Sequence, residues 1–129
     1  MNTSIYDNAE DIAHKVIGAA IEVHKHLGPG LLESAYESCL AIELGQLGLP
    51  SEKQKPLPVL YKGHTVDAAY RLDFLVAGKL ILELKTVERF EPIHTAQVLT
   101  YLRLTGLRLA LLINFNVSIL RDGIKRIIL

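Results

Sequence analysis

The residues of this sequence best suited to chemistry are Asp73, Glu83 and Lys85. Two carboxylates placed side by side repel each other unless a cation lies between them, and Mg²⁺ or Mn²⁺ prefers carboxylate and water oxygens as ligands. A metal held in this way polarises a phosphoryl oxygen and lowers the pKa of a bound water. A nearby lysine positions that water or stabilises the charge that grows on phosphorus. If the fold brings the three residues together, they predict metal-dependent hydrolysis of a phosphodiester bond.

Glu83 and Lys85 belong to a strand expected over residues 80–87. Side chains alternate along a strand, so these two residues share one face. The other face carries Leu80, Leu82 and Leu84. An ordinary Glu–Lys contact on a solvated sheet face would give the same pattern, and the function therefore depends on where Asp73 lies.

Asp73 belongs to the strand before it, and alternation turns it away from Leu72, Phe74 and Val76. Cross-strand partners share a face, so a three-residue turn over residues 77–79 would pair Val76 with Leu80 and Asp73 with Glu83. A two-residue turn would separate the two carboxylates. The candidate site therefore requires a turn with an odd number of residues, or a compensating bulge, and Gly78 gives the backbone freedom for either.

A third carboxylate, Glu33, lies in a helix expected over residues 31–47. At helical spacing it shares a face with Tyr36, Leu40, Leu44 and Leu47. Glutamate is seldom buried without a partner. Glu33 should therefore either reach solvent at the start of the helix, where the helix dipole favours a negative charge, or face a cation.

The helix expected over residues 93–105 adds a stripe of side chains at helical spacing. Its members are His94, Gln97, Tyr101 and Leu104. Gln97 and Tyr101 are candidates to contact a substrate phosphate or to orient Lys85. Alternatively, they form the polar face that any surface helix needs, with Tyr101 closing the core and its hydroxyl in water.

These residues are expected to sit in one α/β (α+β) domain over residues 1–129, since the length and the 50% apolar content suffice for a single core. A first helix is expected over residues 9–27, ended by Gly28-Pro29-Gly30. Residues 52–87 are expected to form a three-stranded antiparallel meander whose first strand, with Pro56 and Pro58, is either an edge strand or starts late. A buried strand over 107–115 and a short strand over 124–129 complete the pattern.

Composition limits the class of function. The 14 basic and 14 acidic residues balance, which argues against non-specific coating of DNA by charge but not against an enzyme with an acidic pocket. No apolar stretch reaches the roughly 18 residues that a membrane span needs, and residues 1–7 do not resemble a secretory leader. The lone Cys39 forms no internal disulfide, which fits a cytoplasmic location.

Taken in order, these motifs resemble the GxxExxY protein family, a group within the PD-(D/E)XK nuclease-like superfamily. The matching segments are Gly30-Leu31-Leu32-Glu33-Ser34-Ala35-Tyr36, Tyr70-Arg71-Leu72-Asp73-Phe74, Leu82-Glu83-Leu84-Lys85 and His94-Thr95-Ala96-Gln97-Val98-Leu99-Thr100-Tyr101-Leu102. Leu72 stands where the superfamily pattern has proline, a position that varies across the superfamily.

The resemblance implies a restriction-endonuclease-like core, with a central mixed sheet flanked by helices. It implies that Glu33, Asp73, Glu83 and the backbone carbonyl of Leu84 bind Mg²⁺ or Mn²⁺, and that Lys85 is the catalytic base or stabiliser. The candidate substrate contacts are Gln97, Tyr101, Tyr36 and His94. The expected substrate is DNA, with RNA second, and the chain is expected to act away from membranes, as a homodimer or a subunit of a complex. The alternatives are a binding module that holds nucleic acid or a partner without cutting, and a purely structural dimer.

Overall fold

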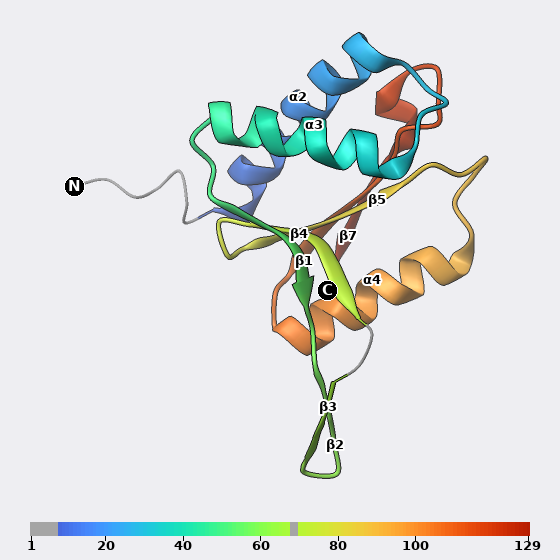
Figure 1. Ribbon diagram of the computed structural model, residues 1–129. Helices are drawn as coiled ribbons and strands as arrows, with labels where there is room; N and C mark the ends of the chain where they lie inside the picture. The colour runs from blue at the N-terminus through green and yellow to red at the C-terminus, as the bar shows by residue number, and fades with distance from the viewer. Residues whose placement is uncertain (1–7, 68–69) are drawn as a thin grey trace.

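The computed structural model describes residues 8–67 and 70–129 and contains a mixed five-stranded sheet with helices on both faces (Figure 1). The strand order is β1-β4-β5-β6-β7. The bounds of these strands are Ser51–Pro56, Arg71–Val76, Leu80–Lys85, Leu109–Asn114 and Ile124–Ile128. Helices α2 (Ala9–Leu27) and α3 (Glu33–Gln46) cover one face, and α4 (Pro92–Thr105) covers the other. The predicted fold class is confirmed.

The helices begin and end where local chemistry favours it. The Asn8 side chain accepts a hydrogen bond from the amide of Glu10 at 2.8 Å and caps α2, which ends at Gly28 with φ 68°. Helix α4 begins with Pro92 in its first turn and ends at Gly106 in the left-handed conformation. Helix α3 begins at Glu33, so the carboxylate expected two residues inside a helix stands in its first position.

The sheet combines an antiparallel meander with one parallel pair. Strands β1, β4 and β5 are antiparallel neighbours, and β1 is an edge strand, which is one of the two outcomes expected. Strands β5 and β6 are parallel, which requires the crossover that α4 supplies. Strand β7 then pairs antiparallel with β6, after the short 3-10 helix η1 (Leu120–Gly123).

The first two strands of the predicted meander are each divided. Strands β2 (Val59–Tyr61) and β3 (His64–Val66) form a separate two-stranded sheet, which extends from the body as an arm (Figure 1). Pro56 and Pro58 lack the amide hydrogen that a continuous ladder needs, and this explains the break after β1. The amide of Leu57, between them, still donates to the carbonyl of Tyr70 at 2.9 Å and ties the base of the arm to the start of β4.

Two apolar clusters lie on the two faces of the sheet. The larger joins α2 and α3 to Leu80, Leu82 and Leu84, and the smaller joins α4 to residues that include Ile81, Ala110 and Leu112. The predicted alternation of β5 is therefore confirmed. In β4 it fails at one position, because Leu72 packs in the α4 cluster while Phe74 and Val76 pack in the other. The chain changes face at Asp73, where ladder pairing is interrupted.

Three further expectations concern Leu47, a membrane span and residues 1–7. Leu47 was placed on the buried face of α3, but it follows the end of the helix and is 47% exposed. Within the described residues, no helix is long and apolar enough to cross a membrane. The expectation about residues 1–7 lies outside the described part of the chain.

Candidate functional site

The turn between β4 and β5 sets the register that brings Asp73 opposite Glu83. It spans residues 77–79 and pairs Val76 with Leu80, as predicted for an odd turn. Ala77 and Gly78 have φ of 52° and 66°, and the amide of Lys79 donates to the carbonyl of Val76 at 3.0 Å. Ladder pairs continue only as far as Phe74 with Leu82, one step before the two carboxylates.

At Asp73 and Glu83, side chains replace the backbone ladder. The amide of Asp73 donates to Glu83 Oε2 at 2.9 Å, and the amide of Leu84 donates to Asp73 Oδ2 at 2.8 Å. Each carboxylate is thereby fixed through one oxygen by a backbone amide of the opposite strand. Among the described residues, the second oxygen of each makes no backbone hydrogen bond, so the two strands separate around a pair of oriented carboxylates.

On the other side of Asp73, the edge strand β1 is also irregular. The register pairs Lys53 with Phe74 and Lys55 with Leu72, but it leaves Gln54 out, and Gln54 has a φ of 51°. Its side-chain amide donates to Glu37 Oε2 at 2.8 Å and more weakly to Asp73 Oδ1 at 3.5 Å. Gln54 therefore links α3 to Asp73 across the edge of the sheet.

Sequence reasoning missed both Gln54 and Glu37. Glu37 follows Glu33 by one helical turn, and two like charges at that spacing destabilise a helix unless something else compensates. That repulsive pair was a readable signal for Glu37. The strand alternation gave no comparable signal for Gln54, because its position depends on a positive φ at a residue other than glycine.

Burial is the main cause that raises the pKa of all three candidate carboxyl groups, and repulsion from a neighbouring carboxylate adds to it. Glu83 is only 3% exposed, and burial together with the charge of Asp73 raises its pKa to about 8. Burial also raises the pKa of Asp73, against the hydrogen bond from Leu84 and the charge of Lys85. Partial loss of hydration, and then the charge of Asp73, raise the pKa of Glu33, although its residue is exposed at the start of α3.

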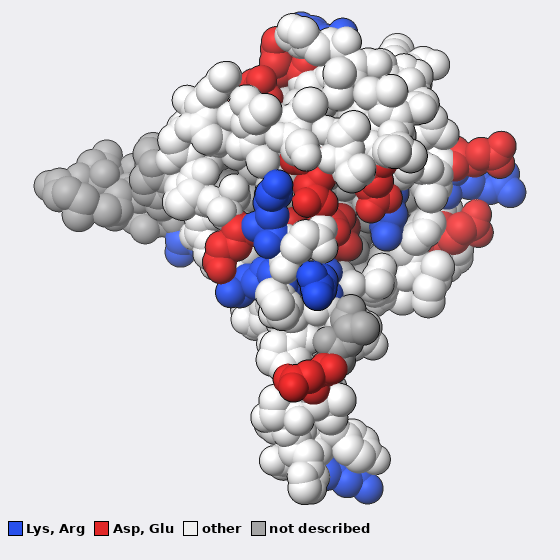
Figure 2. All heavy atoms as spheres, viewed as in Figure 1, with Lys and Arg blue, Asp and Glu red and all other residues white. Residues whose placement is uncertain are grey.

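Lys85 is the positive charge of this group, because its field opposes the pKa increase of all three carboxyl groups. It is half-buried at the end of β5, on the face of Glu83. Acidic and basic side chains gather near the centre of the face shown in Figure 2, below α3. The site thus combines several raised carboxyl pKa values with one nearby lysine, a pattern typical of functional sites.

Asn114, which sequence reasoning also missed, holds the chain just after Lys85. It is the register partner of Lys85 in β6 and is buried. Its side chain accepts from the amide of Val87 at 3.1 Å and donates to the carbonyl of Val87 at 2.8 Å. A polar residue at the end of an otherwise apolar buried strand was the signal in the sequence.

Tyr101 reaches the same site from α4. It is nearly fully buried, and burial, with the charges of Glu83 and Asp73, raises the pKa of its hydroxyl to about 12. Its ring meets the ring of Tyr70 edge to face, with centroids 5.9 Å apart. The hydroxyl is therefore a neutral group beside the carboxylates over the ordinary pH range.

Two of the expected substrate contacts have structural roles. Tyr36 is fully buried, stacks on Phe115 at 4.4 Å, donates to the carbonyl of Gly28 at 2.5 Å and accepts from the amide of Leu31 at 3.2 Å. With no exposed surface it cannot touch a substrate, and that expectation was wrong. His94 Nδ1 accepts from the amide of Glu91 at 2.9 Å and completes the cap of α4. A substrate contact of His94 stays a prediction.

The chemistry of the donor set fits a hard divalent cation, because every candidate ligand is an oxygen. Within the described ranges, however, no three or more His, Cys, Asp or Glu side chains are already grouped as metal ligands. Asp73 and Glu83 are directly linked through the backbone, while Glu33 interacts with Asp73 and Lys85 through charge. The structure brings together the pair predicted on the strands and places Glu33 next to it.

Comparison with known families gives one match. A family model described as the PD-(D/E)XK nuclease superfamily matches residues 10–127, which extends from α2 to β7 and includes every candidate site residue. No curated protein and no solved structure shows a match to the chain.

Proposed function

The chain belongs to the PD-(D/E)XK nuclease superfamily, and from this premise we propose that it is a Mg²⁺-dependent nuclease that cuts DNA, with RNA as the second choice. Its membership of the narrower GxxExxY family is part of the same proposal. One observation carries the proposal. Strands β4 and β5 stop pairing at Asp73 and Glu83, whose carboxylates each accept a hydrogen bond from a backbone amide of the opposite strand, and Lys85 lies nearby. Stability alone does not explain a buried and a half-buried carboxyl group at that point.

The proposed ligands are Asp73, Glu83, Glu33 and the backbone carbonyl of Leu84. The backbone amides hold one oxygen of each of the first two carboxylates, and Gln54 adds a weak hydrogen bond to the other oxygen of Asp73, so both groups are oriented before a metal binds. Bound Mg²⁺ or Mn²⁺ would polarise the phosphoryl oxygen and lower the pKa of a bound water. Because Glu83 has a pKa of about 8, it must lose its proton to become a ligand at neutral pH, and metal binding should release protons.

Lys85 is proposed to stabilise negative charge on the phosphoryl group and to orient the attacking water. It lies on the same strand face as Glu83, two residues further along, and its positive charge already acts on all three carboxyl groups. Asn114 is proposed to keep this end of β5 in place through its two hydrogen bonds to Val87.

A binding module that holds nucleic acid without cutting it is the second candidate. The observation in its favour is that the described residues contain no preassembled group of three metal ligands. In this case the carboxylate site would bind a nucleic-acid end or a partner, and the positive charge of Lys85 would contribute to binding but not to catalysis.

Cleavage of a mixed panel of single-stranded and double-stranded DNA and RNA separates the two candidates. The wild-type protein should cut at least one substrate with Mg²⁺ or Mn²⁺ and none with EDTA, and Asp73→Asn should remove the activity. Asp11→Asn, in the first turn of α2, is the matched control and should cut normally. Binding of nucleic acid without cleavage under any metal would replace the nuclease by the binding module.

A further inference from the structure

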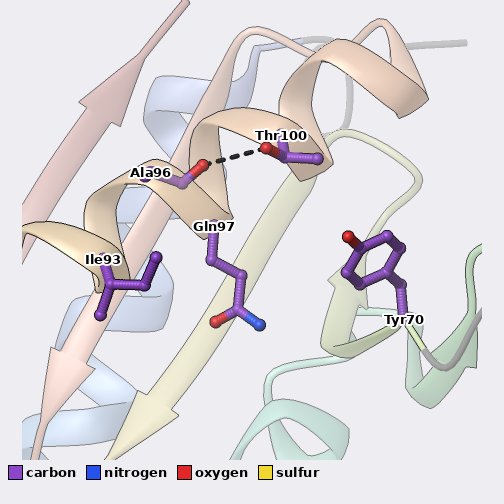
Figure 3. A pocket seen from close by; sticks show the side chains of 5 residues that line it. All are labelled: Tyr70, Ile93, Ala96, Gln97 and Thr100. Carbon is purple, nitrogen blue, oxygen red and sulfur yellow. Dashed lines mark hydrogen bonds between the residues drawn. The ribbon is translucent and has the colours of Figure 1, made fainter.

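The face of α4 next to the candidate site contains a pocket that the metal and the lysine leave unused. It has a volume of about 290 Å³, close to the lower end of ligand pockets at roughly 300 Å³. The residues that line it are Tyr70, Ile93, Ala96, Gln97 and Thr100. In Figure 3 the Tyr70 ring stands across from α4, and the Gln97 side chain lies between Ile93 and Tyr70.

The pocket shares a wall with the carboxylate site. Tyr70 precedes Asp73 by three residues, and its ring lies edge to face with the ring of Tyr101. The charges of Glu83 and Asp73 in turn act on the hydroxyl of Tyr101. Gln97 lies one helical turn before Tyr101 on α4. The contact between Tyr70 and Tyr101 therefore places the pocket next to the carboxylate site.

The chemistry of the pocket differs from that of the site beside it. All five lining residues are uncharged, so the pocket offers a phosphate no positive charge. Tyr70 is 38% exposed and Ile93 69% exposed, which leaves apolar surface for a planar group. The pocket therefore favours a flat, neutral ligand with polar atoms on its edge.

Gln97 supplies the polar contact. In the part of the chain that the structure describes, its side-chain amide has no hydrogen-bond partner, whereas the Thr100 hydroxyl already donates to the carbonyl of Ala96 at 3.1 Å. An amide offers both a donor and an acceptor in one plane, the combination that base edges require.

We propose that this pocket binds one unpaired nucleobase of the strand whose phosphate reaches Lys85, with the base stacked on Tyr70 and its edge bound by Gln97. The inference rests on the proposed function and specifies its substrate class. A base inside a duplex has both its faces and its pairing edge covered, so a ligand that uses both must come from a single strand, a loop or an unpaired end. The balanced charge of the chain agrees, since stacking needs less positive charge than the binding of a duplex backbone.

The test is binding of short oligonucleotides that carry one 2-aminopurine, a fluorescent base quenched by stacking, at successive positions. Ca²⁺ replaces Mg²⁺, so that the readout does not depend on cleavage. Wild type and Tyr70→Phe should quench the base at one position only, and Tyr70→Ala should remove the quenching and raise Kd roughly 5- to 150-fold. Gln97→Ala should keep the quenching and reduce the preference among the four bases. Comparing Kd for the same sequence made as DNA and as RNA shows whether the protein prefers deoxyribose or ribose.

Tyr61→Ala is the matched control, because Tyr61 is an exposed tyrosine on the β2–β3 arm, outside the pocket. It should bind like wild type, and a perfect duplex of the same sequence should bind more weakly than the single strand. Equal quenching at every position, unchanged binding by Tyr70→Ala, or an equal loss in Tyr61→Ala would overturn the proposal. An absence of cleavage in the metal-dependent assay would instead count against the nuclease and leave the binding result standing.

Discussion

Strand β5 carries only apolar side chains on the sheet face covered by α2 and α3, whereas on the face covered by α4 it changes from Ile81 to Glu83 and Lys85. The first face continues as one apolar cluster along the whole strand. The second ends where the carboxylates interrupt pairing with β4. One face therefore holds the fold together, and the other gives up apolar packing at one end to position charged groups.

The largest effect on stability should come from the α2/α3 face. Phe74→Ala removes a fully buried ring from the larger cluster and should lower the free energy of unfolding by about 3–5 kcal/mol, measured by urea denaturation. Leu75 is the next residue, but it is only partly buried and lies on the α4 side, so Leu75→Ala should lower the free energy of unfolding by less. An equal loss for both variants would mean that the two faces do not differ in this way.

The next effect should be on activity. Lys85→Ala should lower the cleavage rate by roughly 10²–10³-fold while metal binding and thermal stability stay close to wild type, because Lys85 is proposed to stabilise charge that develops during the reaction. Lys79→Ala, in the turn at the opposite end of β5, is the control and should cut normally. Full activity in Lys85→Ala would remove Lys85 from the mechanism.

The carboxylate pair should lower the stability of the metal-free protein at high pH. The pKa of Glu83 is about 8 in the folded protein and about 4.5 in an ordinary glutamate, so the folded state binds the extra proton between these values. Stability should fall as pH rises from about 4.5 to 8, by a few kcal/mol at about 1.4 kcal/mol per unit of pKa difference. Glu83→Gln should flatten this fall and be more stable than wild type at pH 8.

Denaturation of both proteins at several pH values in EDTA measures this slope. Glu52→Gln, an exposed glutamate on β1, is the control and should follow the wild-type curve. A wild-type stability that rises with pH over this range would mean that burial and the charge of Asp73 do not raise the pKa of Glu83.

The smallest effect concerns a polar atom on the structural face. Tyr36→Phe removes hydrogen bonds to Gly28 and Leu31 but keeps the ring stacked on Phe115, so it should cost about 1 kcal/mol of stability and leave cleavage unchanged. A loss of substrate binding without a loss of stability would return Tyr36 to the candidate site.

Local rules were enough to predict the helices and the buried strand β6, but they left the register at the turn open. Strand alternation showed that Asp73 lies opposite Glu83 only if the turn is odd or bulged, and the structure has the odd turn. Glu33 was recognisable because a charged residue stood out on an apolar helical face. These inferences needed only neighbours along one element or one hairpin.

The rest of the site depends on contacts between distant segments. Gln54 reaches Asp73 only because β1 pairs with β4 across the inserted β2–β3 arm and because the chain adopts a positive φ there. Leu72 changes face for the same reason, since the ladder that enforces alternation is interrupted beside it. Tyr36 was misread because a motif position shows that a side chain matters and does not show whether it serves the fold or the substrate.

Calorimetric titration of Mg²⁺ into the wild-type protein and into Asp73→Asn tests the central claim most directly, namely that the unpaired ends of β4 and β5 form a divalent metal site. Wild type should bind Mg²⁺ near pH 7 with release of protons, detected as a heat that changes with the ionisation enthalpy of the buffer, since Glu83 must be deprotonated on binding. Asp73→Asn should bind far more weakly. No binding to wild type at millimolar Mg²⁺, or equal binding to both proteins, would contradict the account.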